Sequence, residues 1–559
     1  MATEWPQWTT ELTAKFVTGE DQLGVEGAAQ GYQQYLVPGI ITTTDHARYY
    51  SFYAWVLYRF IEWPGSSRLL KDLRGSFFKR HEVALIVGSY SHHQASEPLG
   101  GLVGSGNNNA KAKSFWDAGD PISLDADYFQ NNLGGFGQYY GTAMQSMGIV
   151  AESDHPGWTY RLTSRGRALA EAYEQSIADT TYLHTLRKTG SMDSLTRQAA
   201  VEYGQAGCIC PEALARSRDR DLLRDAFFRF DQTGGMDNPH VRRRRTLGVT
   251  LDLVHGADGK LERTILRPAL YLGEYAPGLL YQPSEPLSHW TERWKTVEIR
   301  HLYTFGLQCL WAAFLLHLGE QPGGLFYGDY LDWVQSQLPA GLYPKSVSEY
   351  LDELVHSVGL KGDWREECDS FDQACRQETQ HDEYSLYLDA IANSRNAGRL
   401  LNLGLEILAR LFLRFLPRHR ENAPIWQALA TRERLPISGF FDSLQKNLLA
   451  PDWTVARWLD GLYRECILGQ HEFIALEKLR YQKYDTFKFY YRDGRFCWPF
   501  ANPDAYREPI RVAALRLFNA LTILTDLGLV THTAEGCLEL SADGEECWQR
   551  ILREGDNGG

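Results

Sequence analysis

The residues of this chain that could do chemistry do not form a known catalytic pattern. A Gly-rich stretch at 99–106 is followed by three asparagines, whereas a phosphate-binding loop needs Gly-Lys-Ser/Thr at that place. His81 and Glu82 could begin a zinc-protease helix, but Leu85 stands where the second histidine belongs. No Gly-x-Ser-x-Gly nucleophile elbow is present. We therefore predict no catalytic residue and no cofactor.

Two groups of possible metal ligands stand far apart in the sequence. Cys208 and Cys210 could give two thiolates to zinc, and histidines occur at His92 and His93. Structural zinc sites use four ligands at short paired spacings, and no second close cysteine pair follows. The nine cysteines are an odd number scattered over a long chain, which is typical of reduced thiols. The sequence favours ordinary thiols over a metal site.

Asp252 and Glu262 suggest a weak nuclease hypothesis. They flank an expected hairpin with strands at 250–254 and 261–265 and a Gly-rich turn at 256–259. The Glu-x-Lys of such nuclease cores is absent, because Arg263 follows Glu262 and a threonine follows that. A cryptic metal-dependent nuclease therefore stays as one alternative.

The sharpest charge feature is a run of four arginines. Adjacent guanidinium groups repel one another and persist most easily beside phosphates or carboxylates. A solvated loop is the commoner explanation of such a run, and phosphate contacts are the functional one. The run consists of Arg242, Arg243, Arg244 and Arg245. A second set follows one expected helix and its exit, where some members should pair with acidic neighbours: Arg395, Arg399, Arg410, Arg414, Arg418 and Arg420.

One pattern of elements occurs twice. Each copy runs from an amphipathic helix into a glycine break, then through a short β-ribbon into a closing helix. The first copy has a helix at 136–147, after a Gly134-Gly135 turn, and a break at Gly148. The second has apolar residues at helical spacing over 510–524 and a break at Gly528. Both resemble the last third of a winged helix, which binds DNA or protein partners.

The charge on the helices before the two ribbons argues against operator binding. A DNA-reading helix needs cations for the backbone and donors for base edges. No Lys or Arg occurs over 136–150, and the second ribbon carries Glu535 without a cation. The net charge of −13 also disfavours general nucleic-acid binding. The candidate nucleic-acid contacts are Arg242 to Arg245, Arg511 and Arg516, and the candidate partner contacts are Phe136, Tyr139, Tyr140 and Trp158.

Length and composition predict a globular protein of several domains. The chain has 559 residues, of which 44% are hydrophobic and 23% charged. We expect a mainly α fold with small β-hairpins, in which two winged-helix-like domains are joined by a helical scaffold. The expected segments are an aromatic-rich helical segment at 1–70, the first winged helix at 71–180, a mixed connector at 181–289, a helical domain at 290–480 and a hairpin with the second winged helix at 481–559.

Several elements are predicted more closely within these segments. Aromatic residues at 49–63 lie on a broad apolar face that must be buried, and a helix is expected at 77–87. Helices are expected at 298–318 and 386–416, with breakers at Gly319 and Pro417. A hairpin is expected across Asp493-Gly494.

The chain carries no secretory or membrane signal that we recognise. The N-terminal residues lack a basic and an apolar region. The longest apolar stretch, 305–318, is shorter than the roughly 20 residues that cross a bilayer. We expect a cytoplasmic protein without membrane contact.

The N-terminal segment resembles a known group of proteins. Leu23-Gly24-Val25, the stretch LVPGIITTT at 36–44 and the stretch ARYYSFYAW at 47–55 resemble the opening of an uncharacterised bacterial family. Members of that family tend to be encoded among phage-defence and restriction genes, beside helicases, methylases or ATPases. The resemblance implies a setting in bacterial genome defence and a partner encoded nearby, and it assigns no catalytic role.

The leading hypothesis is a non-catalytic scaffold or adaptor subunit of a bacterial defence system, which docks a partner protein through winged helices and contacts DNA only optionally. The first alternative is a sequence-specific DNA-binding transcriptional regulator, and the second is the metal-dependent nuclease. The identity of the partner and the oligomeric state stay open at this point.

Overall fold

The computed structural model describes most of the chain and shows a mainly helical protein. The described residues are 21–61, 74–94, 99–102, 109–125, 131–154, 159–276, 278–377, 382–421, 434–448, 450, 452–482, 485–499, 510 and 514–554. Among them are five two-stranded antiparallel sheets and many helices. The prediction of an α-dominated fold with small β-hairpins is confirmed at this level.

The chain divides into two compact units, each built from segments that are not consecutive. Unit 1 comprises 1–32, 270–280 and 292–513, and unit 2 comprises 33–269, 281–291 and 514–559. This interleaving differs from the five consecutive segments that the sequence suggested. Three described helices contribute residues to both units: α1 (Glu26–Leu36), α12 (Leu266–Leu272) and α13 (Glu285–Gly319).

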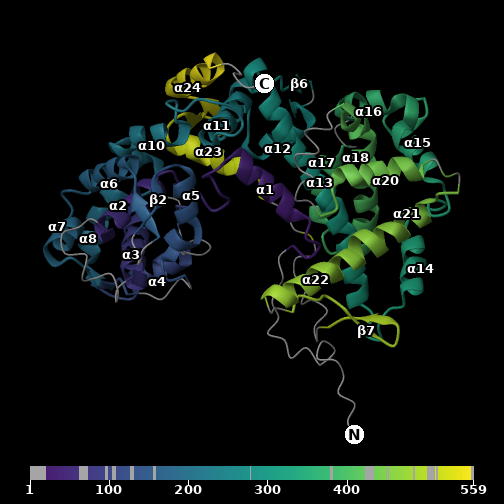
Figure 1. Ribbon diagram of the computed structural model, residues 1–559, viewed down its shortest axis with the longest axis horizontal. Helices are drawn as coiled ribbons and strands as arrows, with labels where there is room; N and C mark the ends of the chain where they lie inside the picture. Colours follow the sequence, from purple (N-terminus) through teal and green to yellow (C-terminus); the bar gives the residue numbers. More distant parts are fainter. Residues whose placement is uncertain are drawn as a thin grey trace, which may run out of the picture. The chain divides into compact units, whose positions relative to one another are not determined.

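Unit 2 is a helical unit with three small sheets, in which α2 contacts α3, α6 and α10 (Figure 1). Its helices are α2 (Tyr49–Ile61), α3 (Arg74–His92), α4 (Ala110–Asp117), η4 (Phe136–Tyr140), α5 (Gly141–Ser146), α6 (Ser164–Ser176), α7 (Thr181–Thr189), α8 (Arg197–Gly207), α9 (Pro211–Ala215), α10 (Asp219–Phe228), α11 (Pro239–Gly256), η5 (Arg263–Ile265), α23 (Arg516–Asp526) and α24 (Ala542–Arg553). Its strands are β1 (Ile122–Ser123), β2 (Val150–Glu152), β3 (Tyr160–Leu162), β4 (Ser194–Leu195), β9 (Val530–His532) and β10 (Leu538–Leu540).

Unit 1 surrounds α18 with helices (Figure 1). Its further helices are α14 (Tyr327–Gln337), α15 (Val347–Ser357), α16 (Trp364–Gln377), α17 (Glu383–Ala392), α18 (Ala397–Glu421), α20 (Ile437–Asn447), α21 (Val455–Gly461), η6 (Leu462–Leu468) and α22 (Gly469–Gln482). Its strands are β5 (Glu274–Ala276), β6 (Leu279–Leu280), β7 (Tyr490–Arg492) and β8 (Arg495–Cys497). α13 and α18 approach closely at two glycines, since a Cβ on Gly404 would lie 2.9 Å from the carbonyl oxygen of Gly306.

Helix α13 is the core helix of unit 1. It is long and apolar enough to span a membrane by length and composition, but 83% of the qualifying stretch is buried inside the protein. Its large side chains form one cluster with those of α18 and α21. This burial is what a core helix shows.

The helices expected at 49–63, 77–87 and 298–318 are confirmed and span 49–61, 74–92 and 285–319, and the hairpin expected across Asp493-Gly494 is confirmed as β7 and β8. The single helix expected at 386–416 is wrong, because α17 ends at Ala392 and α18 begins at Ala397. Asp382 caps α17 by accepting the backbone N–H of Tyr384 at 2.8 Å. Pro417 does not end the following helix but lies inside it.

The hairpin expected at 250–265 is also wrong. Residues up to Gly256 belong to α11, which begins after the N-cap Asn238, whose side chain accepts the N–H of His240 at 2.9 Å. The residues from Thr246 to Val254 are buried all round. A run of buried residues lacks the periodicity that distinguishes a strand from a helix.

Candidate functional site

The two copies of the helix–ribbon pattern exist, and their glycine breaks are alike. The ribbons are the β2–β3 and β9–β10 pairs. Gly148 and Gly528 both have φ +70, in the left-handed region that favours glycine. The residue after each glycine returns a hydrogen bond of 2.9 Å to the preceding helix, from Ile149 to Met144 and from Leu529 to Leu524. In both copies the backbone therefore leaves the helix through the same sharp turn.

A hydroxyl residue closes each copy in the same way. The Oγ1 atom of Thr163 donates to the carbonyl oxygen of Gly148 at 2.8 Å, and the Oγ atom of Ser541 donates to that of Gly528 at 2.7 Å. The same two side chains are the N-caps of α6 and α24. One hydroxyl thus joins the glycine break to the start of the closing helix in both copies.

Close approach of the closing helix requires a second glycine in each copy. A Cβ on Gly166 would lie 2.1 Å from the carbonyl oxygen of Ile149, and a Cβ on Gly544 would lie 1.9 Å from that of Leu529. Carbon atoms do not approach oxygen so closely, so no larger residue fits without movement of the backbone.

Each copy packs on a central helix from an earlier part of the chain. α2 contacts η4, β3 and α6, and α11 contacts α23, β10 and α24 in the same pattern. We call α2, η4–α5, β2–β3 and α6 the first hairpin unit, and α11, α23, β9–β10 and α24 the second hairpin unit. In the first hairpin unit, residues 62–135 lie between α2 and η4 in the sequence. In the second, residues 257–515 lie between α11 and α23. The sequence did not indicate either central helix as part of these units.

The helix before the ribbon of the second hairpin unit is covered by the chain itself. Every residue over 515–530 is buried or half-buried. The backbone N–H of Arg516 donates to the Gln33 Oε1 atom at 2.8 Å, and its guanidinium donates to the carbonyl oxygen of Ile40 at 3.1 Å. Burial lowers its pKa to about 10. This candidate nucleic-acid contact faces the protein interior, and Arg511 lies outside the described residues.

The corresponding helix of the first hairpin unit has one exposed face. Gln138, Thr142 and Gln145 are exposed and Tyr139 is half-buried, which gives an uncharged polar stripe. Phe136 and Tyr140 are fully buried instead, with aromatic neighbours on α2 and α3. These two proposed partner contacts are therefore core residues. Trp158 lies outside the described residues.

Glu82 and His81 have structural surroundings. The Glu82 Oε1 atom accepts the backbone N–H of Gly135 at 2.9 Å and the hydroxyl of Tyr53 at 2.9 Å. This carboxylate therefore sits at the start of the η4 helix, where negative charge is favourable. His81 is hydrogen-bonded to the Tyr182 hydroxyl, and burial lowers its pKa to about 3.

The arginine run lies in α11 and not in a solvated loop. Arg243 donates to the carbonyl oxygen of Phe227 at 2.8 Å, and Arg244 donates to that of Phe228 at 3.0 Å. These carbonyls belong to the last turn of α10, where carbonyl oxygens have no hydrogen-bond donor within their own helix. Arg245 donates to the carbonyl oxygen of Ile551 at 3.2 Å.

Burial of these side chains changes the interpretation of the run. Arg243, Arg244 and Arg245 are buried, so they do not offer their guanidinium groups to phosphates in this conformation. Arg242 is half-buried, lies 4.1 Å from the ring centre of Tyr35 and donates to the Tyr35 carbonyl oxygen at 2.7 Å. The positive charge near the end of α10 is favourable for that helix.

The second arginine set pairs with acidic residues as predicted. Arg410 lies 2.7 Å from Glu406, and Arg414 lies 2.9 Å from Glu383 and 2.8 Å from Asp372. Of the remaining members, Arg399 pairs with Asp389, and the side chains of Arg418 and Arg420 lie outside the described part of the chain.

Asp252 holds unit 2 together and has no open oxygen facing solvent. It accepts hydrogen bonds from the Tyr281 hydroxyl at 2.8 Å, the Ser284 hydroxyl at 2.6 Å and the Trp548 indole at 3.0 Å. Glu262 is exposed and follows α11. The hairpin on which the nuclease hypothesis depended is absent from this described segment.

Residues just before α2 take part in a buried polar network in unit 2. His46 bonds through Nδ1 to Asp526 at 3.1 Å and through Nε2 to the carbonyl oxygen of Gly100 at 2.9 Å. Arg48 and Asp219 form a fully buried pair at 3.2 Å. These residues connect α2 to α10 and α23, so they position the hairpin units and do not form an open reactive site.

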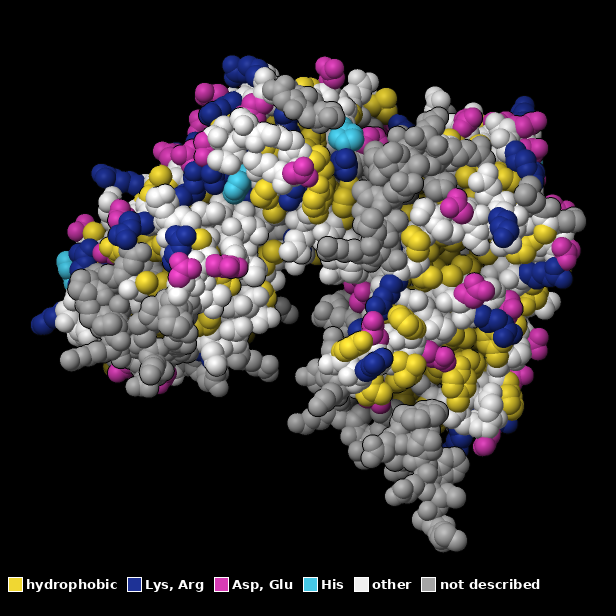
Figure 2. Space-filling view, in the orientation of Figure 1, with side chains coloured by type: hydrophobic (Ala, Val, Ile, Leu, Met, Phe, Trp, Pro, Cys, Tyr) yellow, Lys and Arg dark blue, Asp and Glu magenta, His cyan; other side chains and the backbone are white. Residues whose placement is uncertain are grey.

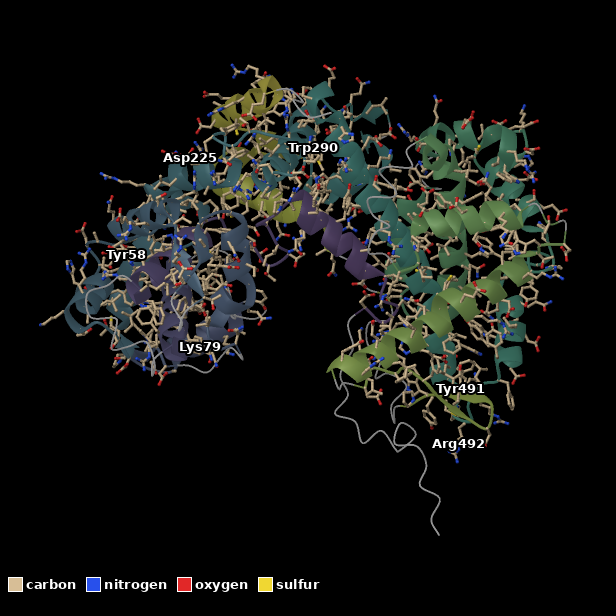
Figure 3. The ribbon with its side chains drawn as sticks, in the orientation of Figure 1. Tyr58, Lys79, Asp225, Trp290, Tyr491 and Arg492 are labelled. Atoms are coloured by element: carbon tan, nitrogen blue, oxygen red, sulfur yellow. The ribbon has the colours of Figure 1, made fainter. Side chains whose placement is uncertain are left out.

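An exposed apolar surface occurs in unit 1 on α22 and β7. Phe473 and Leu476, one helical turn apart, are 55% and 54% exposed, and Tyr491 is 58% exposed. The Tyr491 hydroxyl donates to Glu472 at 2.7 Å, which holds β7 beside α22. We call Phe473, Leu476 and Tyr491 the aromatic patch. Figure 3 shows Tyr491 and Arg492 on the β7 hairpin.

One basic side chain adjoins this patch, because Arg434 lies 5.1 Å from the ring centre of Phe473. The same two elements, α22 and β7, also expose Tyr481 at 73% and Tyr490 at 41%. Figure 2 shows hydrophobic side chains gathered over α22 and β7 on the face that it draws. The sequence offered one signal that was missed: Phe473 and Leu476 flank the buried Ile474 and Ala475, so α22 is apolar beyond its core stripe.

Comparison with known proteins gives no relative. No protein-family model matches the chain, and no curated protein and no solved structure matches it either.

Proposed function

We propose that the protein is a non-catalytic adaptor that binds a partner protein through the aromatic patch of unit 1. The observation that carries this proposal is the exposure of Phe473, Leu476 and Tyr491 on α22 and β7, which the Tyr491–Glu472 hydrogen bond joins. Arg434 lies next to Phe473. Exposed apolar groups that gather on a surface mark interaction sites. Aromatic residues and arginine are the types that contribute most to protein–protein binding.

The two hairpin units serve in this proposal as winged-helix-like frames. α23 of the second unit contacts segments of its own chain, so it would act as an internal docking element and not as a DNA reader. The exposed stripe of the first unit, Gln138, Thr142 and Gln145, has no charge to hold a phosphate. The resemblance of residues 23–55 supports a setting in bacterial phage defence, with a helicase, ATPase or methylase encoded nearby as the partner.

Binding to proteins encoded beside this chain tests the proposal. We expect a stable complex with one such protein, and a Phe473→Ser/Tyr491→Ser double variant should bind it at least about 30-fold more weakly, since a central interface residue contributes roughly 2 kcal/mol or more. Isothermal titration calorimetry measures the change.

A Leu388→Ser/Ile391→Ser double variant is the matched control. Leu388 and Ile391 are exposed apolar residues of the same unit, on α17, and are 50% and 38% exposed. Their replacement should leave the affinity unchanged. Equal loss in both double variants, or no complex with any of the proteins encoded nearby, contradicts the adaptor.

A DNA-binding regulator of its own locus is the alternative outcome. The adaptor should bind upstream DNA of that locus no better than random DNA in a gel-shift titration. A saturable shift that is specific and falls steeply with salt would replace the adaptor by a regulator. Plasmid cleavage by the pure protein with Mg²⁺ or Mn²⁺ would replace it by a nuclease.

A further inference from the structure

The ends of two packed helices in unit 2 bring distant histidines and cysteines together. α3 and α8 approach so closely that a Cβ on Gly204 would lie 2.1 Å from the carbonyl oxygen of Gly88. His92 stands four residues after Gly88, and Cys208 stands four residues after Gly204. Both residues therefore follow the crossing of the two helices by about one turn of chain.

The donor atoms of this cluster lie close together. The nearest ligand atoms of His92, His93 and Cys210 are all within 4.8 Å of one another. The Cys208 sulfur lies 3.6 Å from the Nε2 atom of His93. The side chains of Cys208 and Cys210 also interact with each other. Two imidazoles at the end of α3 and the Cys210 thiol thus form one close group, and the Cys208 thiol adjoins it beside His93.

The spacing of one sulfur–nitrogen pair fits tetrahedral zinc. Zinc binds cysteine sulfur at about 2.3 Å and histidine nitrogen at about 2.0–2.1 Å, so a sulfur and a nitrogen on one tetrahedral ion are about 3.6 Å apart. This separation equals the distance from Cys208 to His93. Sulfur and imidazole together favour zinc over magnesium and calcium, which prefer oxygen.

The surroundings hold the cysteine link in place. The carbonyl oxygen of Cys208 accepts the Arg48 guanidinium at 2.6 Å, and Arg48 is itself paired with the buried Asp219. Cys208 and Cys210 pack with Ala213 and Leu99 in a small apolar cluster. An apolar shell around thiolates limits solvent access to a bound metal.

We propose that His92, His93, Cys208 and Cys210 bind one structural Zn²⁺ ion, which fastens the end of α3 to the link between α8 and α9. The ion would stabilise a place where a short link and two helix ends meet and little apolar packing joins them. No step of the proposed adaptor function depends on this site.

Metal content and cobalt spectroscopy test the site. Wild-type protein dialysed against metal-free buffer should retain about one zinc ion per chain, measured by inductively coupled plasma mass spectrometry. The variants Cys210→Ser and His92→Ala should lose most of it. Cys537→Ser and His184→Ala are matched controls outside the cluster in unit 2, and they should retain it.

Cobalt keeps the test independent of variants that fold poorly. Wild-type protein stripped of zinc and given Co²⁺ should show the thiolate-to-cobalt charge-transfer band and the intense visible bands of tetrahedral coordination. Addition of Zn²⁺ should remove both. Absence of these bands, retention of zinc by Cys210→Ser at the wild-type level, or a disulfide between Cys208 and Cys210 in freshly purified protein overturns the proposal.

Discussion

At the scale of single residues, unit 2 is held by buried charges that have partners. Removal of a charge from water is costly unless an opposite charge and hydrogen bonds replace the solvent. Asp219 accepts from Arg48 and, at 2.6 Å, from the Ser51 hydroxyl. His46 is paired with Asp526, which also accepts the backbone N–H of Ala47 at 2.9 Å. Both pairs therefore join the start of α2 to distant segments of unit 2.

The His46–Asp526 pair predicts a loss of stability at alkaline pH. Burial alone would lower the pKa of His46, but the charge and hydrogen bond of Asp526 and the Gly100 carbonyl raise it to about 9. A histidine whose folded pKa exceeds its ordinary value of 6.5 adds stability that is complete below 6.5 and lost as the pH rises through about 9. The thermal unfolding midpoint of unit 2 should therefore fall across this window.

A His46→Gln variant checks the origin of this fall. Glutamine keeps a hydrogen-bonding group but does not titrate, so the midpoint of the variant should be lower at neutral pH and should change less between pH 6.5 and 9. Differential scanning fluorimetry at several pH values measures both. An equal fall in wild type and variant would assign the effect to other groups.

At the scale of elements, glycine decides how closely helices approach in both hairpin units. Gly166 and Gly544 stand where the closing helices meet the carbonyl oxygens at the start of the β-ribbons. The equivalent hydroxyl caps, Thr163 and Ser541, fix the same geometry. The two units are therefore alike in their backbone hydrogen bonds as well as in the order of their elements.

Replacement of Gly544 by alanine should destabilise the second hairpin unit. The added Cβ would lie 1.9 Å from the carbonyl oxygen of Leu529, so α24 must shift away from the ribbon. Overpacking of this kind costs roughly 1–3 kcal/mol. Urea unfolding followed by tryptophan fluorescence measures the loss, since Trp548 lies on α24.

Gly461→Ala is the control variant, for which we expect a gain in stability. Gly461 is helical, and nothing lies within 4 Å of a Cβ built there. Alanine should stabilise the protein there by about 0.5–1 kcal/mol, because it reduces the freedom of the unfolded chain. Similar losses in both variants would show that the contact at Gly544 is not the cause.

At the scale of the whole molecule, the C-terminal segment of the chain shares unit 2 with residues 33–269. The segment from Ala514 onward packs with residues 33–269, although residues 292–513 belong to unit 1. The Asn519 amide donates to the carbonyl oxygens of Thr42 at 3.3 Å and Thr44 at 3.2 Å. One side chain thus holds a segment that precedes it by more than 470 residues.

Asn519→Ala should loosen that distant segment. Without the amide, the carbonyl groups of Thr42 and Thr44 lose donors, and amide hydrogen exchange over residues 41–47 should become faster. Thr522→Ala is the control on the same helix, because its hydroxyl bonds only the Phe518 carbonyl within α23 at 2.9 Å. Faster exchange in both variants would indicate general loosening of α23.

The sequence determined the elements whose signal is local. The change from helical to alternating spacing around Gly148 and Gly528 predicted both ribbons, and Asp493-Gly494 predicted the β7–β8 hairpin. Turn residues and amphipathic periodicity act over a few neighbouring positions, so they can be recognised without the rest of the chain.

Only the tertiary structure decided what the buried polar residues do. Four adjacent arginines spread around a helix at 3.6 residues per turn, so each of Arg242 to Arg245 meets a different neighbour that the run itself cannot indicate. In the sequence, neither the His92–His93 pair nor the Cys208–Cys210 pair has enough ligands to predict a metal site by itself. The two pairs are more than a hundred residues apart, so the sequence did not connect them. Their convergence depends on the close crossing of α3 and α8, which is a contact between distant segments and is therefore absent from any local pattern.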